Sequence, residues 1–161
     1  PTHECSSAAS DVYKRQRLYR ATQAASRAMG DARSKLDVIR QTIRVTPDLD
    51  ADMLEDVNAL EWRLAALTIK MNGDSTRSRR SAPTPPGIAS RVRTAAFGSV
   101  RVTSSPTQTH RDLYRSAAKM FTPVLADLRK LVEKDIPALE RQLAAAGAAT
   151  PSGLPDWKME D

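Results

Sequence analysis

The chain has 161 residues, with 25 basic and 19 acidic side chains and a formal net charge of +6 at pH 7. A single cysteine, Cys5, excludes an internal disulfide framework, and no apolar run approaches the roughly 20 residues that span a bilayer. Aromatic residues make up only 4% of the chain, which argues against a stacking platform for single-stranded nucleic acid.

The first element is a segment without apolar periodicity. Residues 6–16 read SSAASDVYKRQ, in which small and polar residues follow one another without forming a face. This string resembles the translated end of an adapter used to prepare DNA sequencing libraries. We therefore expect residues 1–16 to be foreign to the natural protein and disordered. The natural chain then contains no cysteine.

The next two elements are predicted helices that form an antiparallel hairpin. Between residues 17 and 45, and again between 51 and 71, apolar residues recur at steps of three and four, the period of one helical face. Pro47 separates the two helices, and Asn72-Gly73 is a typical helix end. The predicted apolar faces are Leu18, Ala21, Ala25, Ala28 or Met29, Ala32, Leu36, Ile39 and Ile43, then Leu54, Val57, Leu60, Leu64, Leu67 and Met71.

The composition then changes over residues 73–87, GDSTRSRRSAPTPPG, an arm rich in arginine and proline. Prolines at 83, 85 and 86 predict an extended, partly polyproline arm that runs over the surface. A short amphipathic helix follows over IASRVRTAAF, with Gly98 after it.

The last predicted element is a long helix from about Thr109 to Leu143, with Pro123 and Pro137 inside it. Each proline removes a backbone donor and crowds the carbonyl four residues earlier, so kinks or breaks are expected at both. The predicted fold is all-α and bundle-like: a helical hairpin, a short helix and a long proline-kinked helix. It makes up one module over residues 17–147, and residues 148–161 form a polar tail.

Residue patterns that carry chemistry are sparse. His110 is the only histidine after residue 16, and no pair of histidines has the spacing of metal ligands. The neighbouring carboxylates of Glu55 and Asp56 lie on the polar side of a predicted helix, and no glycine spacing matches a phosphate-binding loop. The sequence therefore predicts no catalytic residue, cofactor or metal site, and no enzyme activity for this fragment.

Arginines in and after the arm are the candidate contact residues. Their guanidinium groups could bind the phosphates of nucleic acid, pair with carboxylates of a neighbouring domain, or remain solvated. No recognition-helix motif accompanies them and acidic residues are interspersed elsewhere, so contact with a neighbouring domain is favoured over nucleic acid. The residues are Arg77, Arg79, Arg80, Arg91 and Arg93, with Arg101 extending the region.

Several segments in this order resemble one family. They are LTIKMNGDSTRSRRSAPTPPGIASRV, PTQTHRDLYRSAAKMFTPVLADLRKLVEKDIPALERQLAAAGA and PSGLPDW, preceded by RATQAASRAMGDARSKLDVIRQTI. Together they resemble the C-terminal helical region of large exported bacterial proteins with BNR/sortilin-type β-propeller repeats, often labelled glycosyl hydrolases.

That resemblance implies a helical accessory module whose partner is an upstream β-propeller of the same parent chain. It also implies an extracellular or periplasmic location. The Asp box of the propeller repeats, S-x-D-x-G-x-x-W, is missing from the sequence, so the resemblance carries no active-site residue onto this chain. The alternative function is a basic helical module that binds nucleic acid through the region from Arg77 to Arg101. The parent protein's substrate and the oligomeric state stay open.

Overall fold

The computed structural model describes residues 2–46, 49, 51–97 and 108–148, and the regular structure of these residues is entirely helical. The predicted all-α, bundle-like fold is thus confirmed. The helices are α1 (Thr2–Val45), α2 (Ala51–Asn72), α3 (Ser75–Arg79), α4 (Ile88–Phe97), α5 (Gln108–Lys130), the π-helical η1 (Leu131–Asp135) and α6 (Ile136–Ala145).

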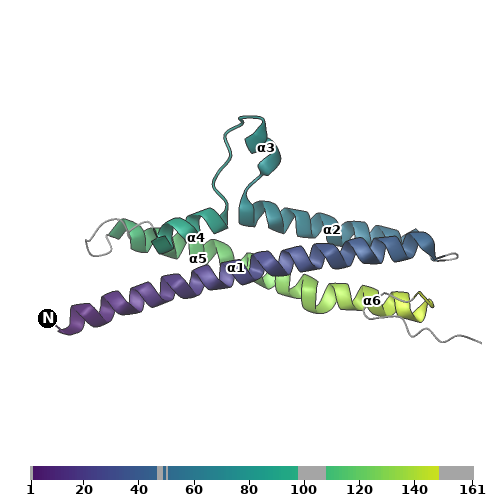
Figure 1. Ribbon diagram of the computed structural model, residues 1–161, viewed down its shortest axis with the longest axis horizontal. Helices are drawn as coiled ribbons and strands as arrows, with labels where there is room; N and C mark the ends of the chain where they lie inside the picture. Colours follow the sequence, from purple (N-terminus) through teal and green to yellow (C-terminus); the bar gives the residue numbers. More distant parts are fainter. Residues whose placement is uncertain (1, 47–48, 50, 98–107, 149–161) are drawn as a thin grey trace, which may run out of the picture.

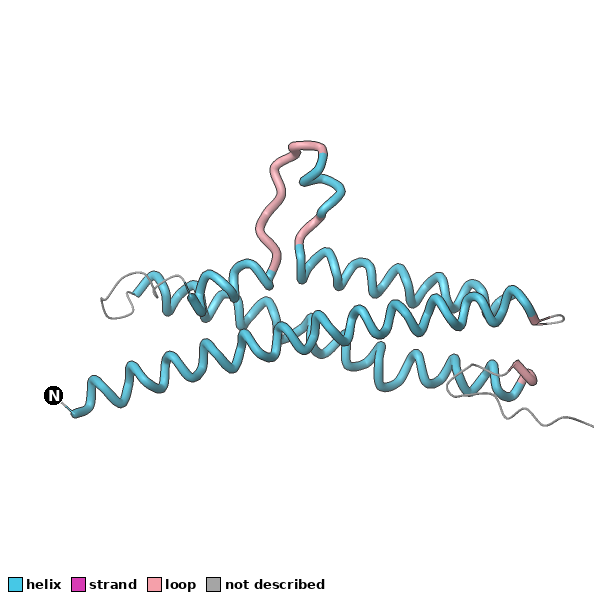
Figure 2. Tube along the Cα trace, viewed as in Figure 1, coloured by secondary structure: helices cyan, strands magenta, loops and turns pink. Residues whose placement is uncertain are grey.

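The helices pack as an elongated bundle (Figures 1 and 2). Helix α1 runs the length of the molecule, and α2 returns along its C-terminal part. Beyond the arm, α4 continues in the direction of α2 along the N-terminal part of α1. Helices α5, η1 and α6 then run parallel to α1 and contact both neighbours. Three long helical segments therefore lie side by side, and the second of them along the chain is α2 followed by α4.

Helix α1 begins earlier than the sequence analysis predicts. The helix includes residues 2–16, so the expectation that this segment is disordered was wrong. Once a helix exists, each added residue forms one hydrogen bond at little cost, and alanine, lysine, arginine and glutamine are good helix formers. The segment also has tertiary contacts: Asp11 lies 3.3 Å from Arg111 of α5, and Arg15 is buried.

The core is a continuous apolar layer between the three segments. Both hairpin helices bury the faces predicted for them, and Leu36, Val57 and Met71 are completely inaccessible to solvent. Near the N-terminal end, the rings of Tyr19 and Phe97 meet edge to face at 4.9 Å between centroids. Further core residues come from the other helices: Ile88, Val92, Ala117, Phe121, Val124, Leu128, Leu131, Ile136, Leu139 and Leu143.

Two glycines bring the ends of the arm together. Helix α2 ends at Asn72, as predicted, and Gly73 has a φ of +84°, a left-handed conformation that favours glycine. A Cβ atom on Gly87 would lie 2.5 Å from the carbonyl carbon of Asn72. The chain thus leaves α2 and enters α4 at nearly the same place, which we call the neck of the arm.

The arm itself differs from the prediction. It projects away from the bundle (Figure 1) instead of running over its surface, and its first part is the short helix α3. The Asp74 side chain caps α3 by accepting hydrogen bonds from the backbone of Thr76 and Arg77 at 3.0 and 3.1 Å. Ser81, with a φ of +55°, turns the chain back, and residues 82–87 have no regular structure.

The two prolines of the third segment behave differently. Of the kink or break expected at Pro123, a break does not occur, because helix α5 continues through this residue. Before Pro137 the helix widens into η1, where the backbone N–H of Ile136 bonds to the carbonyl of Leu131. Pro137 has no N–H to donate to Glu133, and widening the preceding turn relieves its clash with that carbonyl.

The C-terminal boundary of the module lies one residue later than predicted. Gly147 adopts a φ of +77°, and the backbone N–H of Ala148 bonds to the Leu143 carbonyl at 3.0 Å, a common helix end. Ala148 is thereby buried in the core, not part of the tail. Gly98, Arg101 and the segment PSGLPDW, all quoted from the sequence, lie outside the described residues.

Candidate interaction surface

The five candidate arginines divide into two groups. Arg77 and Arg79 belong to α3 and Arg80 follows it, so these three lie on the projecting arm. Arg91 and Arg93 belong to α4, which packs in the bundle. The structure therefore separates residues that the sequence presents as one cluster.

Arginines of the arm are free to meet a partner. Arg77, Arg79 and Arg80 are all exposed, and no hydrogen bond or ion pair of their guanidinium groups occurs within the part of the chain that the structure describes. Their backbone is nevertheless ordered by the Asp74 cap and by turn hydrogen bonds from Arg80 and Ser81 to Arg77 and Ser78. The arm thus presents three exposed cations on a folded support.

Arg91 has a different role from the arm arginines. It is half-buried, and its Nε donates a hydrogen bond to the Pro86 carbonyl at 3.1 Å. This contact ties the last residues of the arm to the first turn of α4. Arg91 therefore holds the neck in place, whereas Arg93 on the same helix is exposed.

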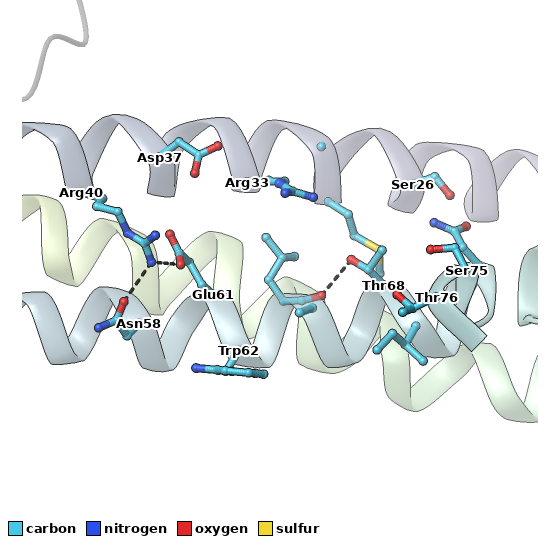
Figure 3. A pocket seen from close by; sticks show the side chains of 16 residues that line it. Ser26, Arg33, Asp37, Arg40, Asn58, Glu61, Trp62, Thr68, Ser75 and Thr76 are labelled. Carbon is cyan, nitrogen blue, oxygen red and sulfur yellow. Dashed lines mark hydrogen bonds and ion pairs between the residues drawn. The ribbon is translucent and has the colours of Figure 1, made fainter. Parts of the chain in front are cut away.

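A groove runs between α1 and α2 and reaches the base of the arm (Figure 3). Its volume is about 780 Å³. Small side chains line much of it, including Ser26 and Gly30 of α1 and Ala65 of α2, and Ser75 and Thr76 of the arm close one end. A Cβ atom added to Gly30 would have no neighbouring atom within 4 Å.

Polar side chains bridge the groove towards its other end. Arg40 of α1 forms an ion pair with Glu61 of α2, and its guanidinium also donates to the Asn58 side chain at 2.9 Å (Figure 3). The Arg40 Nε and the Glu61 Oε1 are buried atoms that have no hydrogen-bond partner among the described residues. Sequence reasoning missed this bridge, because a pair separated by 21 residues has no local signal.

Large apolar side chains on α2 are exposed beside the groove. Trp62 is 78% exposed and Ile69 is 50% exposed, and both contribute to the groove lining. They are seven residues apart, so they share one side of α2. The sequence analysis did not single them out, although Leu60, Leu64 and Leu67 on the core face already place Trp62 on the outer side.

We also searched the described residues for metal ligands, candidate reactive side chains and membrane-spanning helices. No group of three or more His, Cys, Asp and Glu side chains among them could hold a metal ion. His110 lies in the first turn of α5, and Glu55 and Asp56 are exposed on α2. Among the described helices, none combines the length and apolar character needed to cross a membrane.

Comparison with known proteins does not assign the chain to a family. No protein-family model, curated protein or solved structure matches it. The resemblance to the helical end of propeller proteins therefore stays a prediction that rests on the quoted residues.

Proposed function

We propose that this chain is a non-catalytic accessory module of an exported BNR/sortilin-type β-propeller protein, and that it docks on the propeller domain. The observation that carries the proposal is the 78% exposed Trp62, which lies on the same groove as the base of the arginine arm. The order of the quoted segments supports the identity of the partner.

Docking through Trp62 and Ile69 has a clear physical benefit. A tryptophan buries about 150–250 Å² when covered and combines a large apolar ring with one hydrogen-bond donor. Tryptophan and arginine are also the residues most enriched among the dominant contributors to protein interfaces. Here Trp62 lines the groove and the arginines lie on the neighbouring arm, so both residue types can contact one partner.

The exposed arginines of the arm can bind carboxylates of the docked domain. Each guanidinium can form a fork of two hydrogen bonds to one carboxylate. Because the Asp74 cap and the Arg91 contact with Pro86 already order the arm, docking costs less conformational entropy than it would with an unstructured loop.

The first step of the test is to sequence the genomic region upstream and look for Asp-box repeats in frame. The encoded propeller is then produced separately, and its affinity for this chain is measured by calorimetry. Trp62→Ser and the triple change of Arg77, Arg79 and Arg80 to Gln are each expected to weaken binding at least about tenfold.

Val45→Ser is the matched control for Trp62→Ser. Val45 is 75% exposed but does not line the groove, so its replacement should leave the affinity unchanged. An upstream frame without Asp-box repeats contradicts the proposal. So does a propeller whose affinity is the same for Trp62→Ser and the unaltered chain.

A further inference from the structure

Charge is distributed unevenly along the bundle. We divide the described bundle helices near the neck of the arm and leave out residues 1–16 and the arm. The basic half comprises residues 17–30, 88–97 and 108–120, with eight basic residues and one acidic residue. The balanced half comprises residues 31–45, 51–72 and 121–145, with ten basic and ten acidic residues. The sequence mixes these charges, and the packing of α4 and α5 against the start of α1 separates them.

Basic side chains of this half form rows along two neighbouring helices. Arg111, Arg115 and Lys119 follow one another every four residues on one side of α5, and all three are exposed. At a rise of about 1.5 Å per residue the row extends about 12 Å. On α1, a helix that contacts α5, the second row consists of the exposed residues Arg17, Arg20 and Arg27.

Few carboxylates neutralise these rows. Arg115 lies 3.2 Å from Asp112 in an exposed pair, which contributes little in water, and Arg111 pairs with Asp11 of the adapter-like segment. Arg17, Arg20, Arg27, Arg93 and Lys119 make no ion pair within the described ranges. The described carboxylates therefore neutralise the positive charge of the basic half only in part.

We propose that the basic half binds the phosphate backbone of duplex nucleic acid without reading its sequence. Each strand of a duplex carries one phosphate per about 3.4 Å of axis, so a row of cations about 12 Å long can face three or four phosphates. Neutralising them releases condensed counterions, which drives binding. The six cations of the two rows do not line the groove at Trp62.

The composition of the rows favours phosphates over a membrane surface or an acidic protein. Seven of the eight basic residues in this half are arginines, whereas the balanced half has six arginines and four lysines. A guanidinium fork matches two phosphate oxygens, while the attraction of a side chain to an anionic lipid surface is about equal for lysine and arginine. Folded proteins intersperse their carboxylates with cations, whereas a nucleic acid strand supplies an uninterrupted line of charges.

Fluorescence polarisation of a labelled duplex of about 24 base pairs, measured between about 50 and 200 mM salt, tests the proposal. We expect affinity to fall steeply with salt and to be equal for duplexes of different sequence. Replacing Arg111, Arg115 and Lys119 by Gln should flatten the slope of log affinity against log salt by about two to three. Replacing Arg17, Arg20 and Arg27 by Gln should have a similar effect.

The matched control is the Gln triple variant of Lys35, Arg44 and Lys130, three exposed residues of the balanced half. It removes the same charge and should leave the slope unchanged, and circular dichroism verifies that each variant is helical. A slope that flattens equally in the control overturns the proposal, because binding then follows net charge. Displacement of the duplex by polyglutamate or phosphatidylserine vesicles as effectively as by unlabelled duplex also overturns it. So does the absence of salt-sensitive duplex binding at about 50 mM salt.

Discussion

A Cβ atom on Gly87 would lie 2.5 Å from the backbone nitrogen of Gly73, so these two glycines are in direct backbone contact at the neck of the arm. Because the crowding atoms belong to the backbone, they cannot move aside as a flexible side chain could. Close approach at this point is what lets α4 continue the segment that α2 begins.

Gly87→Ala is therefore expected to lower the free energy of unfolding by about 1–3 kcal/mol, the usual effect of forcing extra volume into a packed site. Gly30→Ala is the opposite case: its added methyl group meets open space, and alanine favours the helix by about 0.5–1 kcal/mol over glycine. Urea midpoints of the two variants test this difference in sign. Equal effects would contradict the close contact at the neck.

Buried leucines in the second and third segments should dominate stability. Leu64 is 4% exposed and Leu128 is 2% exposed, so replacing either by Ala should cost about 2–5 kcal/mol. Ile69→Ala, on the outer side of α2, should cost less than about 1 kcal/mol. Chemical denaturation of the three variants measures these costs, and a neutral Leu128→Ala would mean that the core face of α5 is misassigned.

The π-helical turn predicts an unusual tolerance to deletion. Leu131 and Ile136 are both buried although five residues separate them, because η1 adds one residue to the turn. Deleting the exposed Lys134 should restore an ordinary α-helical turn with the same core face, at a cost of about 3 kcal/mol, because the clash of Pro137 with the carbonyl four residues earlier returns. Deleting the exposed Asp127 from the regular part of α5 should instead rotate all later residues by about 100° and abolish cooperative unfolding. Similar thermal transitions for the two deletions would be evidence against this role of η1.

Removal of residues 1–16 should change stability by no more than about 1 kcal/mol. These residues extend α1, and among them Asp11 forms a partly exposed pair with Arg111 and Arg15 is buried. Exposed pairs of this kind contribute about 0–1 kcal/mol. A comparison of urea midpoints for the full and shortened chains measures the effect, and a much larger loss would show that the segment is an integral part of the bundle.

Local patterns in the sequence predict the helical hairpin well. The period of the apolar residues places Leu36, Leu64 and Met71 in the core, where they lie, and Asn72-Gly73 marks the end of α2. These features depend on residues within a few turns of one another. Apolar residues spaced three and four positions apart are therefore sufficient to predict them.

Features that depend on distant contacts could not be predicted in the same way. The apolar period allows either Leu131 or Val132 on the core face, and only packing against the other helices selects Leu131 and the wider turn. Contact between Gly73 and Gly87 needs the whole arm to close. Separation of the basic half likewise arises because α4 lies along the first part of α1 and not beside α2.

The closed neck also makes the arm a natural position for inserting foreign sequence. Since its two ends already touch at Gly73 and Gly87, a longer or shorter segment can replace residues 74–86 without moving α2 or α4. The entropy of closing a flexible loop grows slowly, by about 0.6 kcal/mol for each doubling of its length. A peptide epitope or a second small domain could be displayed there, at the midpoint of a rigid helical rod.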